Sequence, residues 1–261
     1  MQRKIIAGNW KMNHTAEAGE SFWENLNHYL SESSAKSVEV CLFPTFLHLP
    51  LFAQNNPHQI TLGGQNCFEK DHGAFTGEIS AEMLQNIGVN AVLIGHSERR
   101  LLFNEDDAFL ARKCRHALEK GMKVFYCVGE MLEHRMDNSH FQQVKRQLTL
   151  GLFDLPESLL KNLYIAYEPV WAIGTGKTAS CEQAAEMHTF IRKTMAAQFS
   201  PEIASELPIL YGGSVKPGNA EDLLSFPDIN GALIGGCSLN ITDFCSLIQV
   251  GSEVVTAHID K

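Results

Sequence analysis

Three residues of different chemistry, Lys11, His96 and Glu168, each lie at or just beyond the end of a short apolar segment. A carboxylate can act as a general base, and a neutral imidazole can donate a hydrogen bond to a carbonyl. An ammonium group stabilises negative charge that develops on a substrate. This set predicts proton abstraction next to a carbonyl in a small anionic compound.

Glu168 begins a distinctive segment, in which Pro169 follows directly and a glycine-containing loop runs over residues 169–179. Proline has no N–H for strand pairing, so we expect the strand to end here. Gly174 and Gly176 give the loop freedom to close, and Ser180 fits the start of a helix. A general base at the end of a strand, under a closing loop, is one interpretation. An exposed glutamate before a surface loop is the alternative.

His96 is followed by Ser97-Glu98-Arg99-Arg100, a sequence that can open a helical turn. A helix N-terminus disfavours the protonated imidazole, so we predict a neutral His96 that donates to a carbonyl. The alternative is a structural histidine. Lys11, set beside Asn9 at another strand end, is predicted to offer positive charge to an anionic substrate, and the alternative is a solvated lysine.

Two pairs of glycines predict a phosphate site. Gly212-Gly213-Ser214 and Gly235-Gly236 follow the last two apolar segments, where backbone N–H groups can approach a ligand closely. A helix starting near Ser238 would complete the site. Tight turns that need glycine for a positive φ are the alternative.

Other motifs are weaker. Gly-Thr-Gly-Lys-Thr at 174–178 resembles the end of a P-loop, but Trp171 stands where that motif needs glycine. A loose dinucleotide pattern at 174–179 does not follow its strand directly, so a dehydrogenase is a poor alternative. The sequence has no His-Glu-x-x-His motif and no cysteine or histidine pair at ligand spacing. We therefore expect neither a metal nor a cofactor.

Composition narrows the possible partners and location. The 261 residues are 44% apolar, and the formal net charge is −9 at pH 7. This charge argues against nucleic acid or an anionic membrane as the main partner. The seven cysteines are odd in number and scattered, which is typical of reduced thiols in a cytoplasmic protein. We expect no signal peptide and no membrane span.

Strand-like and helix-like segments alternate along the whole chain. Most of the strand-like segments are continuously apolar, which is typical of parallel strands buried on both faces. They cover residues 4–9, 38–43, 60–65, 91–95, 123–128, 163–167, 209–212 and 232–235. Helical patterns cover 15–30, 80–87, 105–120, 140–152, 182–199, 219–226 and 243–250. Eight such units predict a single (β/α)₈ barrel domain over residues 1–261, with an open doubly wound sheet as the alternative.

Six sequence motifs, in order along the chain, resemble the triosephosphate isomerase family. They are NWKMN at 9–13, GAFTGE at 73–78, GHSERR at 95–100, AYEPVWAIGTGK at 166–177, YGGSV at 211–215 and IGG at 234–236. The resemblance implies the same barrel and the interconversion of dihydroxyacetone phosphate and D-glyceraldehyde 3-phosphate, a step of glycolysis and gluconeogenesis. It also implies a homodimer through the loop at 73–80, which would reach a second subunit near Lys11.

The resemblance further implies a role for each matching residue. Glu168 would be the base, His96 the electrophile, and Lys11 and Asn9 would contact the substrate. Gly174, Ser214, Gly235 and Gly236 would hold the phosphate, with Ser97, Glu98, Cys127 and Tyr211 in support. Another sugar-phosphate isomerase or epimerase on the same barrel is the alternative. Cys237 departs from the alanine usual in the family and predicts thiol-sensitive activity, and Asn240-Ile241-Thr242-Asp243 departs at the start of the last helix.

Overall fold

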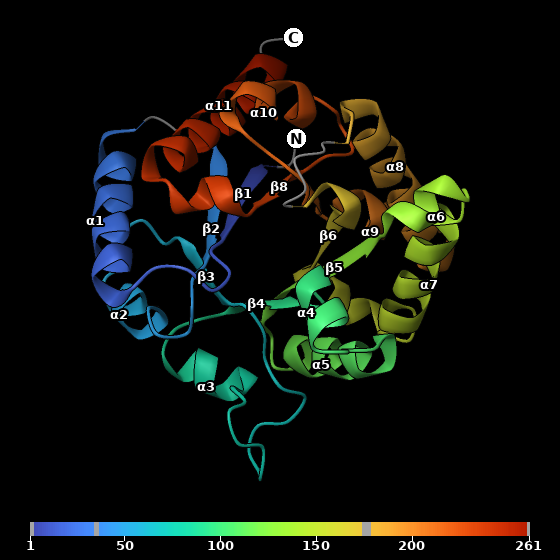
Figure 1. The fold of residues 1–261 in the computed structure, drawn as a ribbon, viewed down its shortest axis with the longest axis horizontal. Coiled ribbons are helices and arrows are strands. Elements are labelled where there is room, and N and C mark those ends of the chain that lie inside the picture. The colour runs from blue at the N-terminus through green and yellow to red at the C-terminus, as the bar shows by residue number, and fades with distance from the viewer. Residues whose placement is uncertain (1–2, 34–36, 174–178, 260–261) are drawn as a thin grey trace.

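A closed barrel of eight parallel strands forms the centre of the molecule (Figure 1). The computed structural model describes residues 3–33, 37–173 and 179–259. The strands are β1 (Lys4–Asn9), β2 (Val38–Phe43), β3 (Thr61–Gly64), β4 (Ala91–Ile94), β5 (Lys123–Glu130), β6 (Leu163–Pro169), β7 (Ile209–Tyr211) and β8 (Gly231–Ile234). Each strand pairs with its neighbours in sequence, and β8 returns to pair with β1. The predicted (β/α)₈ barrel is confirmed, and the open doubly wound sheet is wrong.

Helices surround this barrel on all sides (Figure 1). They are α1 (Ala16–Glu32), α2 (Leu49–Gln54), α3 (Ala81–Asn86), α4 (Ser97–Leu102), α5 (Asp107–Glu119), α6 (Leu132–Met136), α7 (His140–Leu152), α8 (Cys181–Gln198), α9 (Pro201–Glu206), α10 (Pro217–Leu224) and α11 (Ile241–Ile259). Three 3₁₀ segments are η1 (Glu157–Asn162), η2 (Val170–Ala172) and η3 (Gly236–Leu239). The sequence patterns miss the short helices α2, α6 and α9, whose one or two turns show too little periodicity.

The strands are buried on both faces, as their continuous apolar sequences predict. Side chains that point into the barrel form one core, in which Phe125 lies between Phe43 and Tyr164 with ring centroids 5.0 and 4.4 Å away. Alternate residues such as Ile6 point outward into a larger core under the helices. Gly63 leaves room for the interior, because a Cβ there would lie 2.2 Å from the Phe43 ring.

Helix starts and stops follow the predicted capping chemistry. Thr15 accepts the N–H of Ala18 at the start of α1, and Ser180 and Gln183 form a reciprocal capping box at α8. Gly121 has φ 79°, as expected of a residue just beyond a helix. The prediction for the last helix is wrong, because α11 runs through Gly251 to Ile259. Glycine here lets α11 lie close to the barrel, since a Cβ would be 3.2 Å from Ile6.

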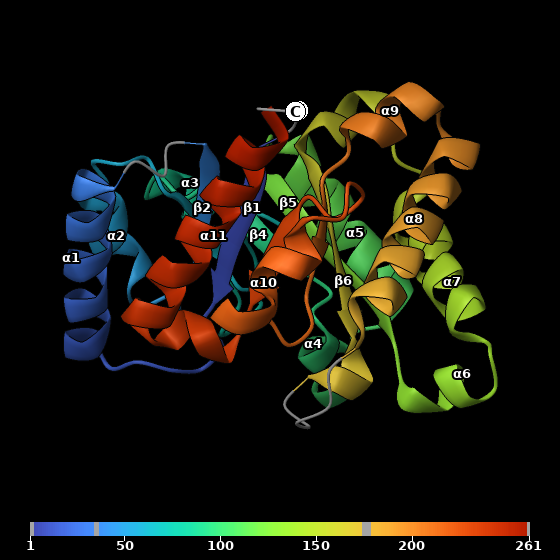
Figure 2. The same cartoon turned by 90° about the horizontal axis from the view of Figure 1, so that it is seen from above.

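The prediction that the strand ends at Pro169 is confirmed, although the strand includes both Glu168 and Pro169. Pro169 is the last residue of the strand and lies in register with Glu130 of β5. Glu168 is therefore a residue of the strand rather than the first residue beyond it. Figure 2 shows that β1 runs toward the end of the barrel at which α4 lies.

Candidate active site

A cavity of about 440 Å³ opens at the C-terminal end of the barrel. The segments at the ends of β1, β4, β6, β7 and β8 form its walls. The predicted site residues that line it are Asn9, Lys11, His96, Glu168, Ser214, Gly235 and Gly236. Gly174, predicted to hold phosphate, lies outside the described residues. The barrel topology thus brings residues from distant parts of the sequence to one cavity.

Glu168 lines this cavity and is only 1% exposed. Its Oε2 accepts a hydrogen bond from the backbone N–H of Ser97 at 2.9 Å, and its Oε1 accepts one from the Ser97 hydroxyl at 3.3 Å. Oε1 also lies 3.0 Å from Nε2 of His96. The alternative of an exposed glutamate is therefore wrong.

The surroundings of Glu168 keep it ionised. Burial raises its pKa, but the adjacent His96, the Ser97 N–H and the Lys11 ammonium lower it by more. The pKa of Glu168 therefore lies below its usual value. A buried carboxylate that is charged at neutral pH has the protonation state that a general base needs.

His96 connects this carboxylate to α4. It is the N-cap residue of that helix, and its Nδ1 accepts the backbone N–H of Glu98 at 3.3 Å. An accepting Nδ1 carries no proton, so the ring proton lies on Nε2, which faces Glu168. Burial lowers the pKa of His96, but the charge and hydrogen bond of Glu168 raise it by more, and the net pKa lies above its ordinary value. In this structure the effect of the Glu168 carboxylate on the pKa of His96 thus outweighs the effect of the N-terminus of α4, from which the sequence predicted a low pKa.

Lys11 is held in place by backbone and side-chain contacts. Its φ of 54° lies in the left-handed region, and its N–H donates to Oδ1 of Asn9 at 3.0 Å. Gln65 donates to the carbonyl of Lys11 at 2.8 Å from the segment after β3. Nζ of Lys11 lies 2.6 Å from Oε1 of Glu98. These contacts aim the ammonium into the cavity rather than into solvent.

The glycines of the predicted phosphate site do not need a positive φ. Neither pair is among the positive-φ glycines, so the alternative of left-handed turns is wrong. A Cβ on Gly212 would lie 2.9 Å from Cγ of Glu168, and one on Gly213 would lie 2.2 Å from the Tyr211 hydroxyl oxygen. A Cβ on Gly236 would meet nothing within 4 Å. Gly236 begins η3, so the short helix expected near Ser238 starts two residues earlier.

Comparison with known proteins agrees with this geometry. A family model described as triosephosphate isomerase matches residues 4–251. The chain is 47% identical over 250 residues to the triosephosphate isomerase of Flavobacterium psychrophilum, covering 95% of this chain and 99% of that protein. It is 48% identical over 250 residues to those of Flavobacterium johnsoniae and Chloroherpeton thalassium, with the same coverage.

The chain belongs to the triosephosphate isomerase family.

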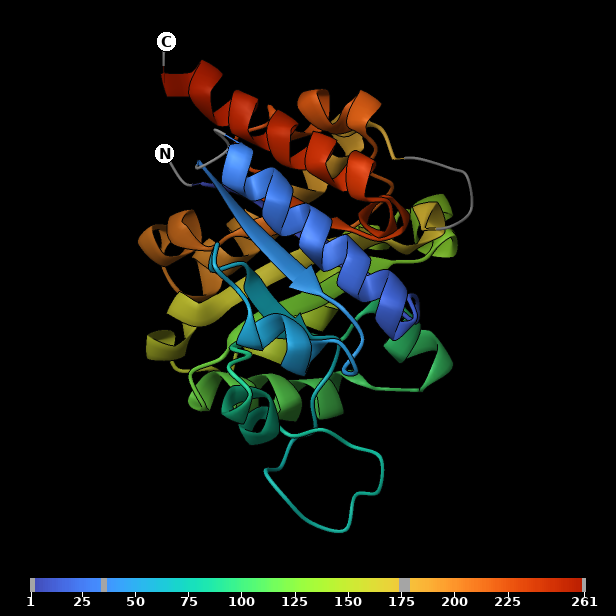
Figure 3. The same cartoon turned by 90° about the vertical axis from the view of Figure 1, so that its left-hand side faces the viewer.

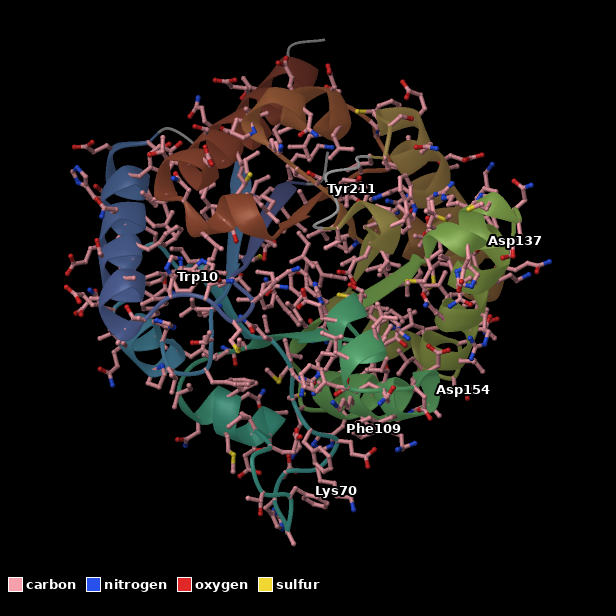
Figure 4. The ribbon with its side chains drawn as sticks, viewed as in Figure 1. Trp10, Lys70, Phe109, Asp137, Asp154 and Tyr211 are labelled. Carbon is pink, nitrogen blue, oxygen red and sulfur yellow. The ribbon has the colours of Figure 1, made fainter. Side chains whose placement is uncertain are left out.

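The supporting residues expected of a triosephosphate isomerase differ in what they contact. Ser97 contacts Glu168 directly, and Glu98 contacts Lys11. Cys127 is buried inside the barrel, and burial together with the charge of Glu168 raises the pKa of its thiol. Tyr211, labelled in Figure 4, is buried beside Gly213, and its hydroxyl has no hydrogen-bond partner among the described residues.

Four further residues contribute to the site and were not predicted from the sequence. Asn13 and Lys216 line the cavity, and Gln65 supports Lys11. Trp10, labelled in Figure 4, packs against Phe22 of α1, and its Nε1 donates to the carbonyl of Ser238 at 3.1 Å. Local signals existed for Trp10 and Asn13, which lie in the NWKMN motif, and for Lys216, which follows the Gly212-Gly213-Ser214 motif, whereas Gln65 depends on a contact between distant loops.

Membrane-spanning helices and metal sites are both absent from the described part of the chain. No helix there is both long and apolar enough to span a membrane. Within the same ranges, no cluster of three or more histidine, cysteine or acidic side chains could hold a metal ion.

Proposed function

We propose that this chain interconverts dihydroxyacetone phosphate and D-glyceraldehyde 3-phosphate through an enediolate. The observation that carries the proposal is the buried, ionised carboxylate of Glu168, 3.0 Å from Nε2 of His96 in a cavity that Lys11 also lines. Membership of the triosephosphate isomerase family supports the same reaction. The alternative of another sugar-phosphate isomerase gives no reason for this combination of residues.

In the proposed reaction, Glu168 takes a proton from one carbon and returns it to the neighbouring carbon. The electron pair left by the proton forms the double bond of the enediolate, and the carbonyl oxygen takes the negative charge. In this structure Oε2 of Glu168 contacts Ser97 and Oε1 contacts both Ser97 and His96, so the base must leave these contacts to reach the substrate. Gly212 leaves room for the Glu168 side chain beside it, because a Cβ on Gly212 would lie 2.9 Å from Cγ of Glu168.

His96 and Lys11 are proposed to act on the oxygen. The Nε2–H of His96 donates to the substrate carbonyl and passes a proton between the two oxygens of the enediolate. The ammonium of Lys11 stabilises the negative charge on those oxygens, with Asn9 fixing its backbone. Ser214, Gly235 and Gly236 offer backbone N–H groups to the phosphate. Closure of the loop at 169–179 would exclude water from the enediolate.

We also propose that two copies of the chain form a homodimer. The segment between β3 and α3, which includes residues 73–80, projects away from the barrel in Figures 1 and 3, and Figure 4 labels Lys70 within it. Met12, beside Lys11, is 93% exposed, and Leu47 is 89% exposed. A projecting loop that covers such side chains in a second copy would bury apolar surface and support Lys11. Analytical ultracentrifugation tests this proposal.

Two further features fit an enzyme of this kind. We propose that residues 1–261 act as one domain, because a single continuous barrel contains the strands of the described ranges. All seven cysteines fall within those ranges and are unpaired, which supports a cytoplasmic location.

The decisive experiment measures isomerisation of D-glyceraldehyde 3-phosphate, with EDTA present, for the native chain and for Glu168→Gln and Glu168→Asp. General-base catalysis contributes about 10²–10⁴-fold, so Glu168→Gln should lose at least that much of kcat. Glu168→Asp withdraws the base by about 1 Å and should cost on the order of 100-fold. Fast native turnover that survives Glu168→Gln would remove Glu168 as the base. A folded native chain with no turnover would favour another sugar phosphate as substrate.

A further inference from the structure

Most of the ionisable side chains that line the cavity offer no free positive charge to a phosphate ester. The ionisable lining side chains among the described residues are Lys11, His96, Glu168, Lys216 and Cys237. A phosphate monoester carries about −1.5 to −2 charges at neutral pH. The substrate proposed above is therefore an anion that enters an acidic protein of net charge −9.

Lys11 does not supply a free positive charge. Nζ of Lys11 lies 2.6 Å from Oε1 of Glu98. The Glu98 carboxylate therefore cancels most of the long-range field of the Lys11 ammonium. Glu168 adds another negative charge to the cavity wall. Lys11, Glu98 and Glu168 together sum to one negative charge, which would repel an incoming phosphate. Another cation is needed to reverse this field.

Lys216 has the position and the freedom to be that cation. Its backbone is fixed at the N-cap of α10, where its N–H donates to Oδ1 of Asn219 at 2.8 Å. Its side chain is exposed at the cavity, and no carboxylate within the described ranges forms a salt bridge with it. Its charge is thus not offset as that of Lys11 is.

The charge of Lys216 acts on the same turn that Lys11 approaches. A Cβ on Gly235 would lie 3.5 Å from Cε of Lys11. Two residues further on, burial and Asp243 raise the pKa of the Cys237 thiol, and Lys216 acts in the opposite direction. Lys11 thus approaches the Gly235–Cys237 turn, and the charge of Lys216 acts on it from another loop.

We propose that Lys216 is the residue that attracts the phosphate group of the substrate into the cavity and holds it there, opposite the compensated Lys11. This inference rests on the proposed function for the identity of the substrate. Lys216 would act on association and on affinity for the phosphate, and it would take no part in the proton transfers. Its effect should therefore appear in kcat/KM and depend on salt.

The experiment compares Lys216→Gln and Lys216→Arg with the native chain. At low ionic strength, Lys216→Gln should lower kcat/KM about 3- to 10-fold, and at about 0.5 M salt the loss should fall below about 2-fold. We expect kcat to be unchanged, and Lys216→Arg should retain most of kcat/KM because it keeps the charge. Lys161→Gln is the matched control, since Lys161 is exposed just before β6, at the other end of the barrel. It changes the net charge equally and should have no effect.

Two readouts separate this proposal from a structural effect and from the proposed function. Turnover of glyceraldehyde, which has no phosphate, should be equal in Lys216→Gln and the native chain, and an equal loss for both substrates would overturn the proposal. Binding of inorganic phosphate, measured by calorimetry, should weaken in Lys216→Gln even if the chain proves not to be an isomerase. Native phosphate affinity and native kcat/KM at low salt in this variant would refute the role of Lys216.

Discussion

Gly212→Ala offers a sharp test of the placement of the base. A Cβ at this position would lie 2.9 Å from Cγ of Glu168 and 3.2 Å from the carbonyl oxygen of Tyr167. Carbon atoms in contact prefer about 3.5–4.0 Å, so the Glu168 side chain must shift by roughly 0.6–1.1 Å. A displacement of about 1 Å at a reacting group can cost on the order of 100-fold. We therefore expect kcat to fall about 10- to 100-fold.

The same substitution should leave the protein folded. Gly212 has no positive φ, so alanine fits its backbone, and crowding of a packed site typically costs about 1–3 kcal/mol. Steady-state kinetics with D-glyceraldehyde 3-phosphate and the midpoint of thermal unfolding measure the two effects separately. Gly218→Ala in α10 is the control, because a Cβ there meets nothing within 4 Å, and its kcat should be unchanged. A Gly212→Ala enzyme that is folded and has native kcat would refute the argument that Glu168 needs this space.

Three further predictions concern other parts of the molecule. Trp10→Phe removes the donor to the Ser238 carbonyl, so the free energy of unfolding should fall by about 1–3 kcal/mol and KM should rise; an unchanged KM in steady-state assays would contradict a positioning role. Cys237 lines the cavity and its pKa is raised by burial and Asp243, so inactivation by iodoacetamide should accelerate with pH and disappear in Cys237→Ala; equal inactivation of both proteins would point to another cysteine. Burial lowers the pKa of Lys4 from 10.5 to about 8, so the folded state binds fewer protons than the unfolded state between these values. The native chain should therefore gain stability relative to Lys4→Met as pH rises from 8 to 10.5, by on the order of 3 kcal/mol, and a flat difference in denaturation curves would rule this out.

The barrel and most of the site were predictable because their signals are local. A strand buried on both faces must be apolar along its length, and residues just beyond parallel strands meet at one end of the barrel. Asn9, Lys11, His96 and Glu168 were identified in this way. The pairing between Ser97 and Glu168 was not, because a contact across 71 residues is set by the closure of the barrel and leaves no periodic pattern.

Where prediction failed, a tertiary contact overrode a local preference. Gly251 looks like the end of a helix, yet α11 continues because glycine allows close packing on Ile6. The strand predicted over residues 163–167 continues to Pro169, because β5 still pairs with its last two residues. The glycines after β7 look like turn residues, and Gly212 is instead needed because Glu168 occupies the space that a side chain would take.

The contact between Glu168 and His96 links the position of the base to the charge of the imidazole. With the carboxylate 3.0 Å from Nε2, the pKa of His96 is raised and the pKa of Glu168 is lowered. A base that reaches a substrate carbon must leave this contact, and the interaction that favours the imidazolium then disappears. Burial, the charge of Lys11 and the N-terminus of α4 remain and favour neutral His96, and burial outweighs the opposing charge of Glu98. We therefore propose that His96 becomes the neutral electrophile expected from the sequence only when the cavity is occupied, and that the movement of the base toward the substrate prepares the imidazole to donate its proton.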